Sequence, residues 1–273
     1  MAGVNVKTTN GASKTVDTSA AKGLAQSLKG ELVTADSPRY DKARAIWNAM
    51  IDRRPALIAS CATADDVVAS VRFAKENDLM VAVRGGGHNI AGNAVCDGGL
   101  MIDLSSMRAV QVDAAKKTVR VEGGATLGDL DQGTQAHGLA VPVGINSTTG
   151  VAGLTLGGGF GWLSRKYGLT IDNLLSANMV TAAGEMVTAS ERENADLFWA
   201  VRGGGGNFGI VTSFEFKAQS IGTEVLSGLI VHPFADARDV LRFYRDFTAK
   251  APDELAVWFV LRKAPPLPFL PEQ

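Results

Sequence analysis

A histidine that follows three glycines is the residue in this sequence best suited to covalent chemistry. His88 lies in the segment Arg84-Gly-Gly-Gly-His-Asn89. A neutral imidazole is a nucleophile near neutral pH, so His88 can form a bond to an electrophilic carbon. A lone loop histidine can instead simply hydrogen-bond to the backbone. The segment therefore predicts either a covalent attachment point or a structural loop.

A second glycine cluster lies between residues 150 and 161. Glycine loses more conformational freedom on folding than other residues, so a dense cluster indicates that the backbone closely approaches something. Amide N–H groups without neighbouring side chains can converge on phosphate oxygens. The two clusters therefore predict a site for one extended dinucleotide, and tight packing between elements is the alternative. The glycines of the second cluster are Gly150, Gly153, Gly157, Gly158, Gly159 and Gly161.

A third glycine run satisfies the pattern G-x-G-x-x-G through Gly204, Gly206 and Gly209. A Rossmann loop needs a strand before this pattern and a helix after it, because the helix N-terminus holds the pyrophosphate. Here the spacing predicts a helix over 194–201 before the glycines and a strand over 210–216 after them. The order is reversed, which excludes a Rossmann nucleotide site.

Other catalytic classes lack their motifs. The sequence contains no P-loop, no H-E-x-x-H and no G-x-S-x-G. The three histidines, His88, His137 and His232, do not predict a metal site. Cys61 and Cys96 have neither metal-ligand spacing nor enough partners for a disulfide framework, so we expect small buried thiols in a reducing compartment.

Composition narrows the class of protein further. The chain has 273 residues, of which 46% are hydrophobic, so one large or two modest domains are expected. The formal net charge of -1 provides no field that attracts nucleic acid or anionic membranes. No segment approaches the ~20 apolar residues of a membrane span, and residues 1–29 lack the apolar core of a signal peptide. We therefore expect a cytoplasmic protein that binds neither nucleic acid nor membranes.

Helices and strands are predicted to alternate around these motifs. Thr63 begins a helix that ends near Asn77-Asp78, and the apolar run 80–83 is a strand that stops at the first glycines. Two apolar runs flank Ala183-Gly184 as a hairpin, which favours an α+β fold over a purely parallel sheet. Further strands are expected at 100–104 and 119–121 and a further helix at 127–136, and prolines 265, 266, 268 and 271 disfavour regular structure at the end.

Several motifs in order resemble those of one known family. They are Arg84–Asn89, Asn146–Gly161, Arg165–Gly168 and Arg202–Val211. Together they are similar to the FAD-linked oxidases of the vanillyl-alcohol oxidase superfamily, whose FAD-binding domain is called PCMH-type, and specifically to the berberine bridge enzyme-like branch. The likeness runs from about Trp47 to about Phe216. The resemblance implies a FAD-binding domain of two α+β subdomains with the cofactor between them.

The resemblance also implies how the cofactor is attached. Family members link the flavin 8α-methyl group to a histidine that matches His88. Some carry a second bond from a cysteine four positions before the glycine that matches Gly150, and that position is Asn146 here. Asparagine cannot add to the flavin ring, so a single 8α-histidyl link is expected.

Position-by-position transfer gives the remaining expected cofactor contacts. The residues expected along the pyrophosphate and isoalloxazine are Ser147, Thr148, Gly150, Val151 and Gly153. Those expected near the adenosine are Gly209, Ile210 and Val211. Trp162 and Tyr167 either touch the flavin or pack. The full expected set is Arg84, Gly85, Gly86, Gly87, His88, Asn89, Asn146, Ser147, Thr148, Gly150, Val151, Gly153, Leu154, Gly157, Gly158, Gly209, Ile210 and Val211.

The domain organisation follows from the same resemblance. We expect a flexible lead-in with a first helix over 1–45, the FAD-binding domain over 46–220, and over 221–273 the opening strand, helix and strand of a substrate domain. Family members continue for about as many residues again, and the catalytic base is expected in that further part. The implied activity is hydride transfer to FAD from a hydroxyl-bearing small molecule such as a sugar, alcohol or secondary metabolite, with reoxidation by oxygen or another acceptor. A non-catalytic FAD-binding fragment is the alternative.

Overall fold

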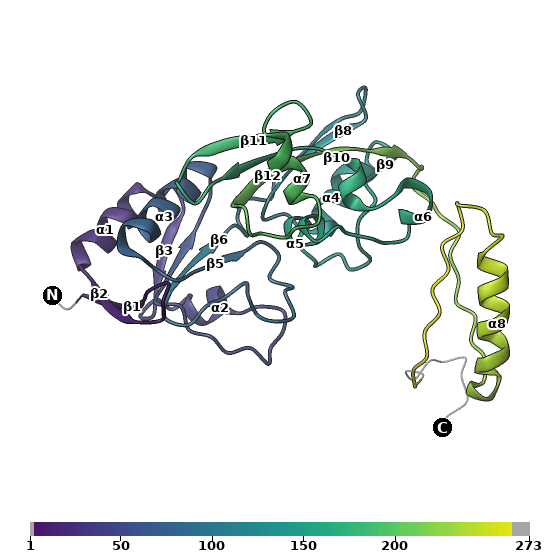
Figure 1. Ribbon diagram of the computed structural model, residues 1–273, viewed down its shortest axis with the longest axis horizontal. Coiled ribbons are helices and arrows are strands. Elements are labelled where there is room, and N and C mark those ends of the chain that lie inside the picture. Colours follow the sequence, from purple (N-terminus) through teal and green to yellow (C-terminus); the bar gives the residue numbers. More distant parts are fainter. Residues whose placement is uncertain (1–2, 264–273) are drawn as a thin grey trace. The chain divides into compact units, whose positions relative to one another are not determined.

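The computed structural model describes residues 3–263 (Figure 1). The chain forms two compact units, and the division falls between Thr223 and Glu224. The larger unit contains two main sheets, and the described part of the smaller unit, residues 224–263, contains one long helix. Within the described part of the chain, no helix is both long and apolar enough to cross a membrane.

The first sheet of the larger unit has four strands in the order β3-β4-β6-β5. Strands β4, β6 and β5 run parallel, and β3 pairs with β4 antiparallel. The central strands are apolar runs without alternation, as expected where both faces of a sheet are covered. Helices α1 and α3 pack against this sheet, and α2 contacts β3. The elements are β3 (Glu31–Thr34), β4 (Leu57–Ser60), β5 (Val81–Arg84), β6 (Leu100–Asp103), α1 (Thr18–Ser27), α2 (Tyr40–Arg44) and α3 (Ala64–Asn77).

Helix α3 begins and ends where the sequence predicts. The Thr63 side chain accepts a hydrogen bond from the backbone of Asp66, and Asp78 ends the helix in the left-handed conformation. Val67 and Phe73 are buried on its inner face. The helix also contacts β10 and β12 of the second sheet, so one amphipathic helix contributes to the packing of both sheets.

The second sheet is antiparallel, with the order β11-β10-β12-β8-β7. The predicted hairpin is confirmed as β10 and β11, which pair antiparallel, and the mixture of the two sheets with helices confirms the α+β fold. Helices α4, α5 and α7 supply buried side chains to the core of this sheet, including Leu130, Val151 and Phe198. The elements are β7 (Val110–Asp113), β8 (Thr118–Glu122), β10 (Leu174–Val180), β11 (Met186–Ser190), β12 (Ile210–Lys217), α4 (Leu127–Gln135), α5 (Val151–Leu156) and α7 (Ala195–Val201).

The N-terminal region contains strands as well as helices between Val4 and Arg44, where a flexible lead-in with a first helix was expected over residues 1–45. A hairpin of β1 (Val4–Lys7) and β2 (Ser13–Val16) is joined to the rest because the Lys7 N–H donates to the carbonyl of Gly98 at 2.7 Å. Val6 and Val16 are buried. These apolar residues stand singly among polar ones, so composition alone concealed two half-buried strands.

Several short elements complete the larger unit. Strand β9 (Leu139–Ala140) pairs with β13 (Gln219–Ser220), and α6 (Ser164–Tyr167) precedes the 3-10 helix η1 (Thr170–Asn173).

The smaller unit contains the 3-10 helix η2 (Phe234–Asp236) and α8 (Ala237–Thr248). Strands were expected on either side of α8, and this prediction is wrong for the described residues. A β-strand needs a hydrogen-bonded neighbour, and none of the sheets includes a strand from 224–263. The Tyr244 hydroxyl donates to the carbonyl of Val257 at 2.8 Å and ties the second segment to α8. The four prolines expected to resist regular structure lie outside the described residues.

Candidate cofactor site

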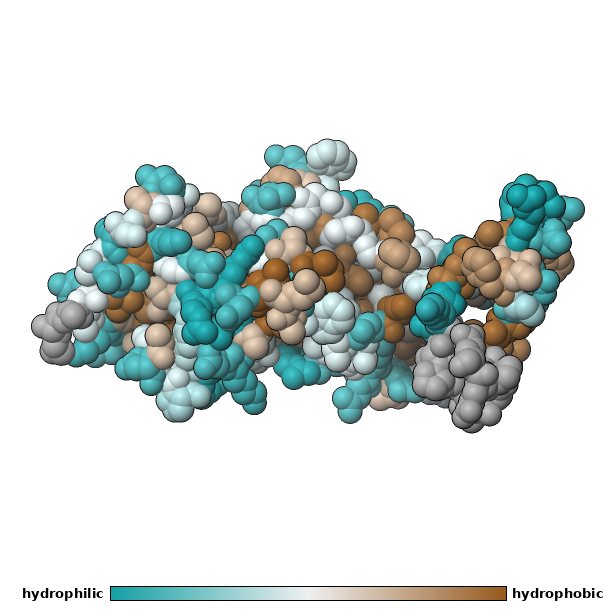
Figure 2. All heavy atoms as spheres, turned by 90° about the horizontal axis from the view of Figure 1, so that it is seen from below, coloured by the Kyte–Doolittle hydropathy of each residue, from teal (hydrophilic) through white to brown (hydrophobic). Residues whose placement is uncertain are grey.

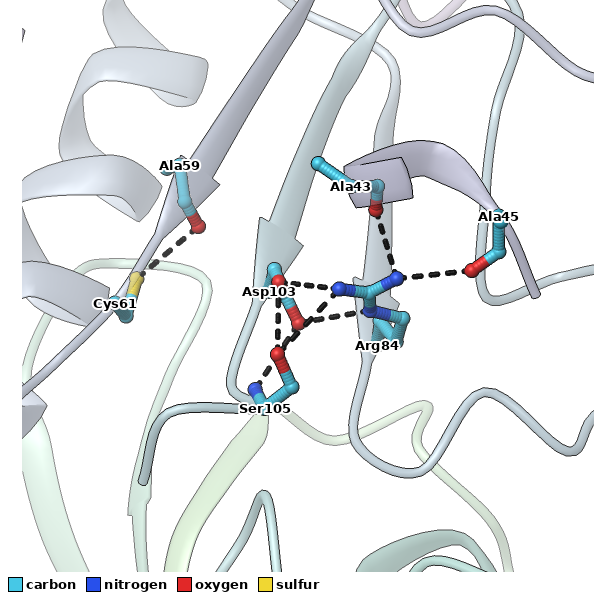
Figure 3. Close-up of polar contacts among 7 residues, drawn as sticks. All are labelled: Ala43, Ala45, Ala59, Cys61, Arg84, Asp103 and Ser105. Carbon is cyan, nitrogen blue, oxygen red and sulfur yellow. Dashed lines mark hydrogen bonds and ion pairs between the residues drawn. The ribbon is translucent and has the colours of Figure 1, made fainter. Parts of the chain in front are cut away.

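The first glycine loop starts from a tethered strand end. Strands β5 and β6 pair in parallel with Arg84 opposite Asp103. The Arg84 guanidinium donates from Nε and one terminal nitrogen to the two Asp103 carboxylate oxygens at 2.8 and 2.5 Å. Its other terminal nitrogen donates to the carbonyls of Ala43 and Ala45 at 2.7 and 3.0 Å (Figure 3). Such a bidentate, largely buried pair fixes geometry as well as charge.

These bonds give the side chain of Arg84, one of the expected cofactor contacts, a structural role. Its side chain borders the hollow beside the glycine loop, but its donors are engaged by Asp103, the two alanine carbonyls and Ser105. The guanidinium therefore anchors the loop and has no donor left for a cofactor.

The two glycine clusters lie against each other. A Cβ atom on Gly86 would lie 2.3 Å from the backbone nitrogen of Gly150, and one on Gly150 would lie 2.4 Å from the nitrogen of Gly86. Gly87 has φ +72°, a conformation that disfavours other residues. Gly161 is similarly close to the carbonyl of Val143. Part of the glycine content thus serves backbone packing, which was the alternative in the sequence interpretation.

The same loop presents amide groups without acceptors. Among the described residues, the N–H groups of Gly85, Gly86 and Gly87 donate no hydrogen bond. Gly87 is buried, and buried amides are nearly always paired with something. The loop borders a hollow of about 160 Å³. Consecutive unpaired amides suit phosphate oxygens, so the arrangement fits the pyrophosphate of a dinucleotide. The other hollow-lining residues are Ala45, Ile46, Trp47, Arg84, Ser105, Arg108, Gly124 and Thr126.

Sequence reasoning missed most of this lining. Ser105 follows β6, just as the glycines follow β5. Because the ends of neighbouring parallel strands meet at one edge of a sheet, the segment Asp103-Leu-Ser105 could have indicated that Ser105 lies beside the glycine loop. Arg108 forms an ion pair with Asp129 at 2.5 Å, which neutralises its charge. A phosphate group would therefore be bound chiefly by backbone amides.

His88 joins the two glycine loops through its side chain. Its Nε2 atom lies 2.9 Å from Oγ1 of Thr148, and its ring stacks on the indole of Trp47 with 5.1 Å between centroids. Burial lowers the pKa of His88 below its ordinary value of 6.5, so the imidazole is neutral near neutral pH. Trp47 was not among the residues expected at the site, although the family likeness begins there.

The loop before α5 is held by its own turn. The Thr149 N–H donates to the carbonyl of Asn146 at 3.0 Å, and the carbonyl of Ser147 accepts from the N–H of Gly128 at 2.9 Å. Asn89 makes a comparable turn beside His88, since its side-chain oxygen accepts from the Asn93 N–H at 3.0 Å. The side chains of Asn146, Ser147 and Thr148 lie on the surface.

Helix α5 contains a glycine that the chain itself does not require. Nothing lies within 4 Å of where a Cβ on Gly153 would stand, and its φ is not positive. A helical glycine costs about 1 kcal/mol relative to alanine, so open space beside Gly153 suits close approach by a ligand. A Cβ on Gly157 would meet only ordinary contacts, with the carbonyl oxygens of Gly153 and Leu154 at 3.5 and 3.7 Å, and nothing lies within 4 Å of the Cβ position of Gly158. Val151 is buried and Leu154 partly buried in the core, so these two side chains pack.

The third predicted group lies at the start of β12. Ile210 and Val211 are buried in the hydrophobic core, so only their backbone can meet a cofactor. Gly209 has φ +142°, and a Cβ there would lie 2.6 Å from the carbonyl of Val180. The carbonyl of Val211 approaches Gly123, next to the hollow-lining Gly124. The backbone of this segment therefore lies near the first loop.

The remaining candidates are two cysteines and two aromatic residues. Cys61 and Cys96 are free thiols, and burial raises their pKa to about 12 and about 11. Trp162 is about half exposed, and the carbonyl of Tyr167 accepts from the side chain of Asn173 at 2.9 Å. No group of three or more histidine, cysteine or carboxylate side chains suited to a metal ion occurs in residues 3–263.

Two sheets with packed helices, glycine loops with unpaired amides and a histidine beside them are features of a dinucleotide-binding class of protein. Comparison with known families agrees, since residues 55–190 match the family described as FAD binding domain. The chain belongs to the FAD-linked oxidases of the vanillyl-alcohol oxidase superfamily, in the berberine bridge enzyme-like branch.

Individual relatives support this membership. The chain is 43% identical over 204 residues to (R)-6-hydroxynicotine oxidase of Paenarthrobacter nicotinovorans, covering 75% of this chain and 44% of that protein. The crystal structure of 6-hydroxy-D-nicotine oxidase from Arthrobacter nicotinovorans superposes with a TM-score of 0.70 at 43% identity, covering 71% of this chain and 43% of the other.

A third match is the glucooligosaccharide oxidase of Acremonium strictum, with a TM-score of 0.67 and 38% identity over 73% of this chain and 42% of the other. The chain thus spans less than half the length of these three relatives.

Proposed function

We propose that this chain provides the FAD-binding part of an oxidoreductase that takes hydride from a hydroxyl-bearing small molecule, such as a sugar, alcohol or secondary metabolite. FAD is bound through one covalent 8α-histidyl link to His88, and molecular oxygen reoxidises it. The family membership and the oxidases among its relatives support this proposal. The Acremonium relative is described with an oligosaccharide substrate and an 8α-N1-histidyl, 6-S-cysteinyl FAD.

One observation carries the proposal. The His88 ring lies against the second glycine loop, with Nε2 at 2.9 Å from Thr148 Oγ1, and the unpaired amides of Gly85–Gly87 immediately precede it. A nucleophile therefore adjoins a phosphate-binding loop, as a covalently held dinucleotide requires. Since Nε2 faces Thr148, the other ring nitrogen, Nδ1 (called N1 in flavin nomenclature), is the one that forms the link.

The link is single because of the residue at 146. A thiol there would supply a second bond, but Asn146 has an amide whose nitrogen lone pair is delocalised. Cys61 and Cys96 do not substitute for it, because both are buried and burial holds them as thiols.

The chain's own residues have distinct tasks in this proposal. The amides of the first loop bind the pyrophosphate, and the open side of α5 at Gly153 admits the cofactor. Arg84 and Asp103 hold the loop in place, and Trp47 limits rotation of the His88 ring. Bound FAD supplies the acceptor for two electrons and a proton as hydride. No residue of this chain is assigned as the base that removes the substrate hydroxyl proton.

The covalent link is tested by acid precipitation of protein loaded with FAD. Flavin absorbance should remain in the pellet, and intact mass should exceed that of the chain by one FAD. In His88→Gln the flavin should move to the supernatant, whereas His137→Gln should behave as the parent. Release of all flavin from the parent protein, with no added mass, would show that the link is absent.

A non-catalytic FAD-binding fragment is the second candidate, because no described residue is assigned as the base that removes the substrate hydroxyl proton. Anaerobic mixing with sugars, alcohols and hydroxylated amines separates the two. Bleaching of the flavin near 450 nm by any donor would support an enzyme. A flavin that stays oxidised with every donor, while dithionite reduces it, would support the fragment.

A further inference from the structure

Asn146, Thr148 and His88 form a chain of hydrogen bonds whose direction can be worked out. The backbone N–H of Thr148 can only donate, so the Asn146 atom 3.0 Å away is the carbonyl oxygen Oδ1 and not the amide nitrogen. The same Oδ1 lies 2.8 Å from Thr148 Oγ1. An amide oxygen has no proton, so the Thr148 hydroxyl donates to it.

The direction of this bond determines the state of the histidine. The Thr148 hydroxyl has one proton, which points to Asn146, so toward His88 Nε2 at 2.9 Å it accepts. Nε2 therefore carries the ring proton. In a neutral imidazole the other nitrogen then has the lone pair, and the nucleophilic atom of His88 is Nδ1.

We propose that Thr148 and Asn146 are positioning residues for flavin attachment, which hold His88 in the tautomer whose lone pair is on Nδ1. The inference rests on the proposed covalent function. We call the hydrogen-bonded chain of Asn146, Thr148 and His88 the relay. In it, the side-chain oxygen of Asn146 accepts the hydroxyl proton of Thr148. Trp47 adds a second constraint, since its stacking at an interplanar angle of 23° restrains the ring plane.

A purely structural role for this relay is weak on energetic grounds. Asn146 and Thr148 lie on the surface, where hydrogen bonds exchange readily with water and contribute little to folding. The hydrogen bond from the Thr148 backbone N–H to Asn146 would by itself suffice to hold the turn at residues 146–149. The hydroxyl bond to His88 adds orientation and tautomer control.

The attachment step balances with oxygen as the oxidant. The Nδ1 lone pair forms a bond to the 8α carbon, one C–H bond of the methyl group breaks, and Nε2 gives up its proton. The flavin ring takes up the two electrons of the broken C–H bond and the two released protons, so the linked flavin is first formed in its reduced state. Molecular oxygen then takes both electrons and both protons as hydrogen peroxide, and the linked flavin is oxidised again. Thr148 accepts from Nε2–H at the start, so it does not compete for the Nδ1 lone pair.

The tautomer can be tested without any cofactor. In protein labelled with ¹⁵N-histidine, long-range ¹H–¹⁵N spectra at pH 8 distinguish a protonated from an unprotonated ring nitrogen, and His88→Gln assigns the signals. We expect a protonated Nε2 and an unprotonated Nδ1 at His88. Thr148→Val should shift the signals toward a mixture of tautomers, and Thr148→Ser should restore the parent pattern. A protonated Nδ1 in the parent, or an unchanged pattern in Thr148→Val, would overturn the inference.

Attachment kinetics provide the second readout. FAD is added to apoprotein, and acid-stable flavin is followed with time. The rate should fall roughly fivefold in Thr148→Val, the fold-change that loss of one exposed hydrogen bond gives, and recover in Thr148→Ser. Asn146→Asp keeps the acceptor oxygen and should stay near the parent rate, whereas Asn146→Leu should slow it. Equal rates in all four variants would contradict the positioning role.

The two readouts separate this inference from the proposed function. If His88 shows the expected tautomer and the parent protein binds FAD only reversibly, the covalent function fails while the relay remains as described. If attachment proceeds but the tautomer and rates do not respond to Thr148, the relay fails and the covalent function stands.

Discussion

At the scale of single residues, the charge of His88 controls its reactivity. Only the neutral ring is nucleophilic, and burial lowers its pKa below 6.5. The neutral form therefore persists to a lower pH than in a free histidine. We predict that the rate of covalent attachment declines in acid, with a midpoint below pH 6.5, and approaches a plateau at higher pH. Acid-stable flavin should be measured at saturating FAD from pH 4.5 to 8, and a midpoint above 6.5 would contradict the prediction.

A second prediction at this scale concerns Asp66, a carboxylate that is 1% exposed. Its oxygens accept from the backbone N–H groups of Lys29, Gly30 and Ala62 at 2.9, 3.0 and 2.8 Å. Burial alone would raise the pKa of Asp66, but these donors outweigh it and the net shift is downward. The stabilisation is therefore present above the ordinary pKa of about 3.9 and disappears as the pH falls below it.

Replacing this carboxylate tests its contribution. Asp66→Asn should lower the free energy of unfolding by about 2 kcal/mol at pH 7, because a neutral amide satisfies three amide donors poorly. The difference from the parent should shrink toward pH 3. Asp65→Asn, on the exposed side of the same helical turn, should change stability by less than about 1 kcal/mol. Urea unfolding measures both, and equal losses in the two variants would argue against the buried role.

At the scale of elements, α5 allows stability and binding to be separated. Gly153→Ala should raise the stability of the apoprotein by about 0.5–1 kcal/mol, because the backbone is helical and the space is open. The same methyl group should weaken FAD binding at least tenfold if the cofactor lies against α5. Thermal melts and flavin fluorescence titration measure the two effects.

Gly23→Ala is the matched control for this prediction. Gly23 lies in α1, also with nothing within 4 Å of its Cβ position, but away from the glycine loops. It should gain similar stability and leave FAD affinity unchanged. If Gly153→Ala keeps full affinity, FAD does not approach α5 at that point.

Elements with strong local signals could be predicted from sequence. Helix α3 was found from Thr63 and its apolar spacing, and the β10–β11 hairpin from Ala183-Gly184, because capping and turn chemistry act within a few residues. The N-terminal hairpin was missed because its apolar residues stand singly. The strands expected in the smaller unit were wrong because a strand depends on a partner that local sequence does not reveal.

The same distinction holds for the candidate site. His88 and both glycine loops were identified by residue type. The contact between Gly86 and Gly150 could not be identified in this way, since it joins segments far apart in sequence and depends on tertiary packing. The bonds of the Arg84 side chain were not predicted either, because Asp103 becomes its neighbour only when β5 and β6 pair. Ala43 and Ala45, at the end of α2, come from a segment far from Arg84 in the sequence.

At the scale of the whole molecule, every proposed cofactor contact lies in the larger unit, residues 1–223. We predict that a chain ending at Thr223 binds FAD within about threefold of the affinity of the 273-residue chain, because α8 supplies none of these contacts. Flavin fluorescence titration of both chains provides the measurement. A loss beyond tenfold, in a shortened chain with the parent's circular dichroism, would assign residues 224–273 a part in binding.

Hydrophobic surface also belongs to this scale. Figure 2 shows brown, hydrophobic groups among teal, hydrophilic ones on the face that it presents. Phe160 and Trp199, both in the larger unit, are 64% and 79% exposed. Isolated apolar residues are normal on protein surfaces, so these positions alone do not identify a partner.

The contact between Gly86 and Gly150 restricts how the site can change by mutation. Each Cβ would collide with main-chain atoms of the other loop, not with a side chain that a second substitution could shorten. Neither position can therefore compensate for the other, and the defects of Gly86→Ala and Gly150→Ala should not rescue each other when combined. A library randomised at both positions and selected for bound flavin should return glycine at each one independently.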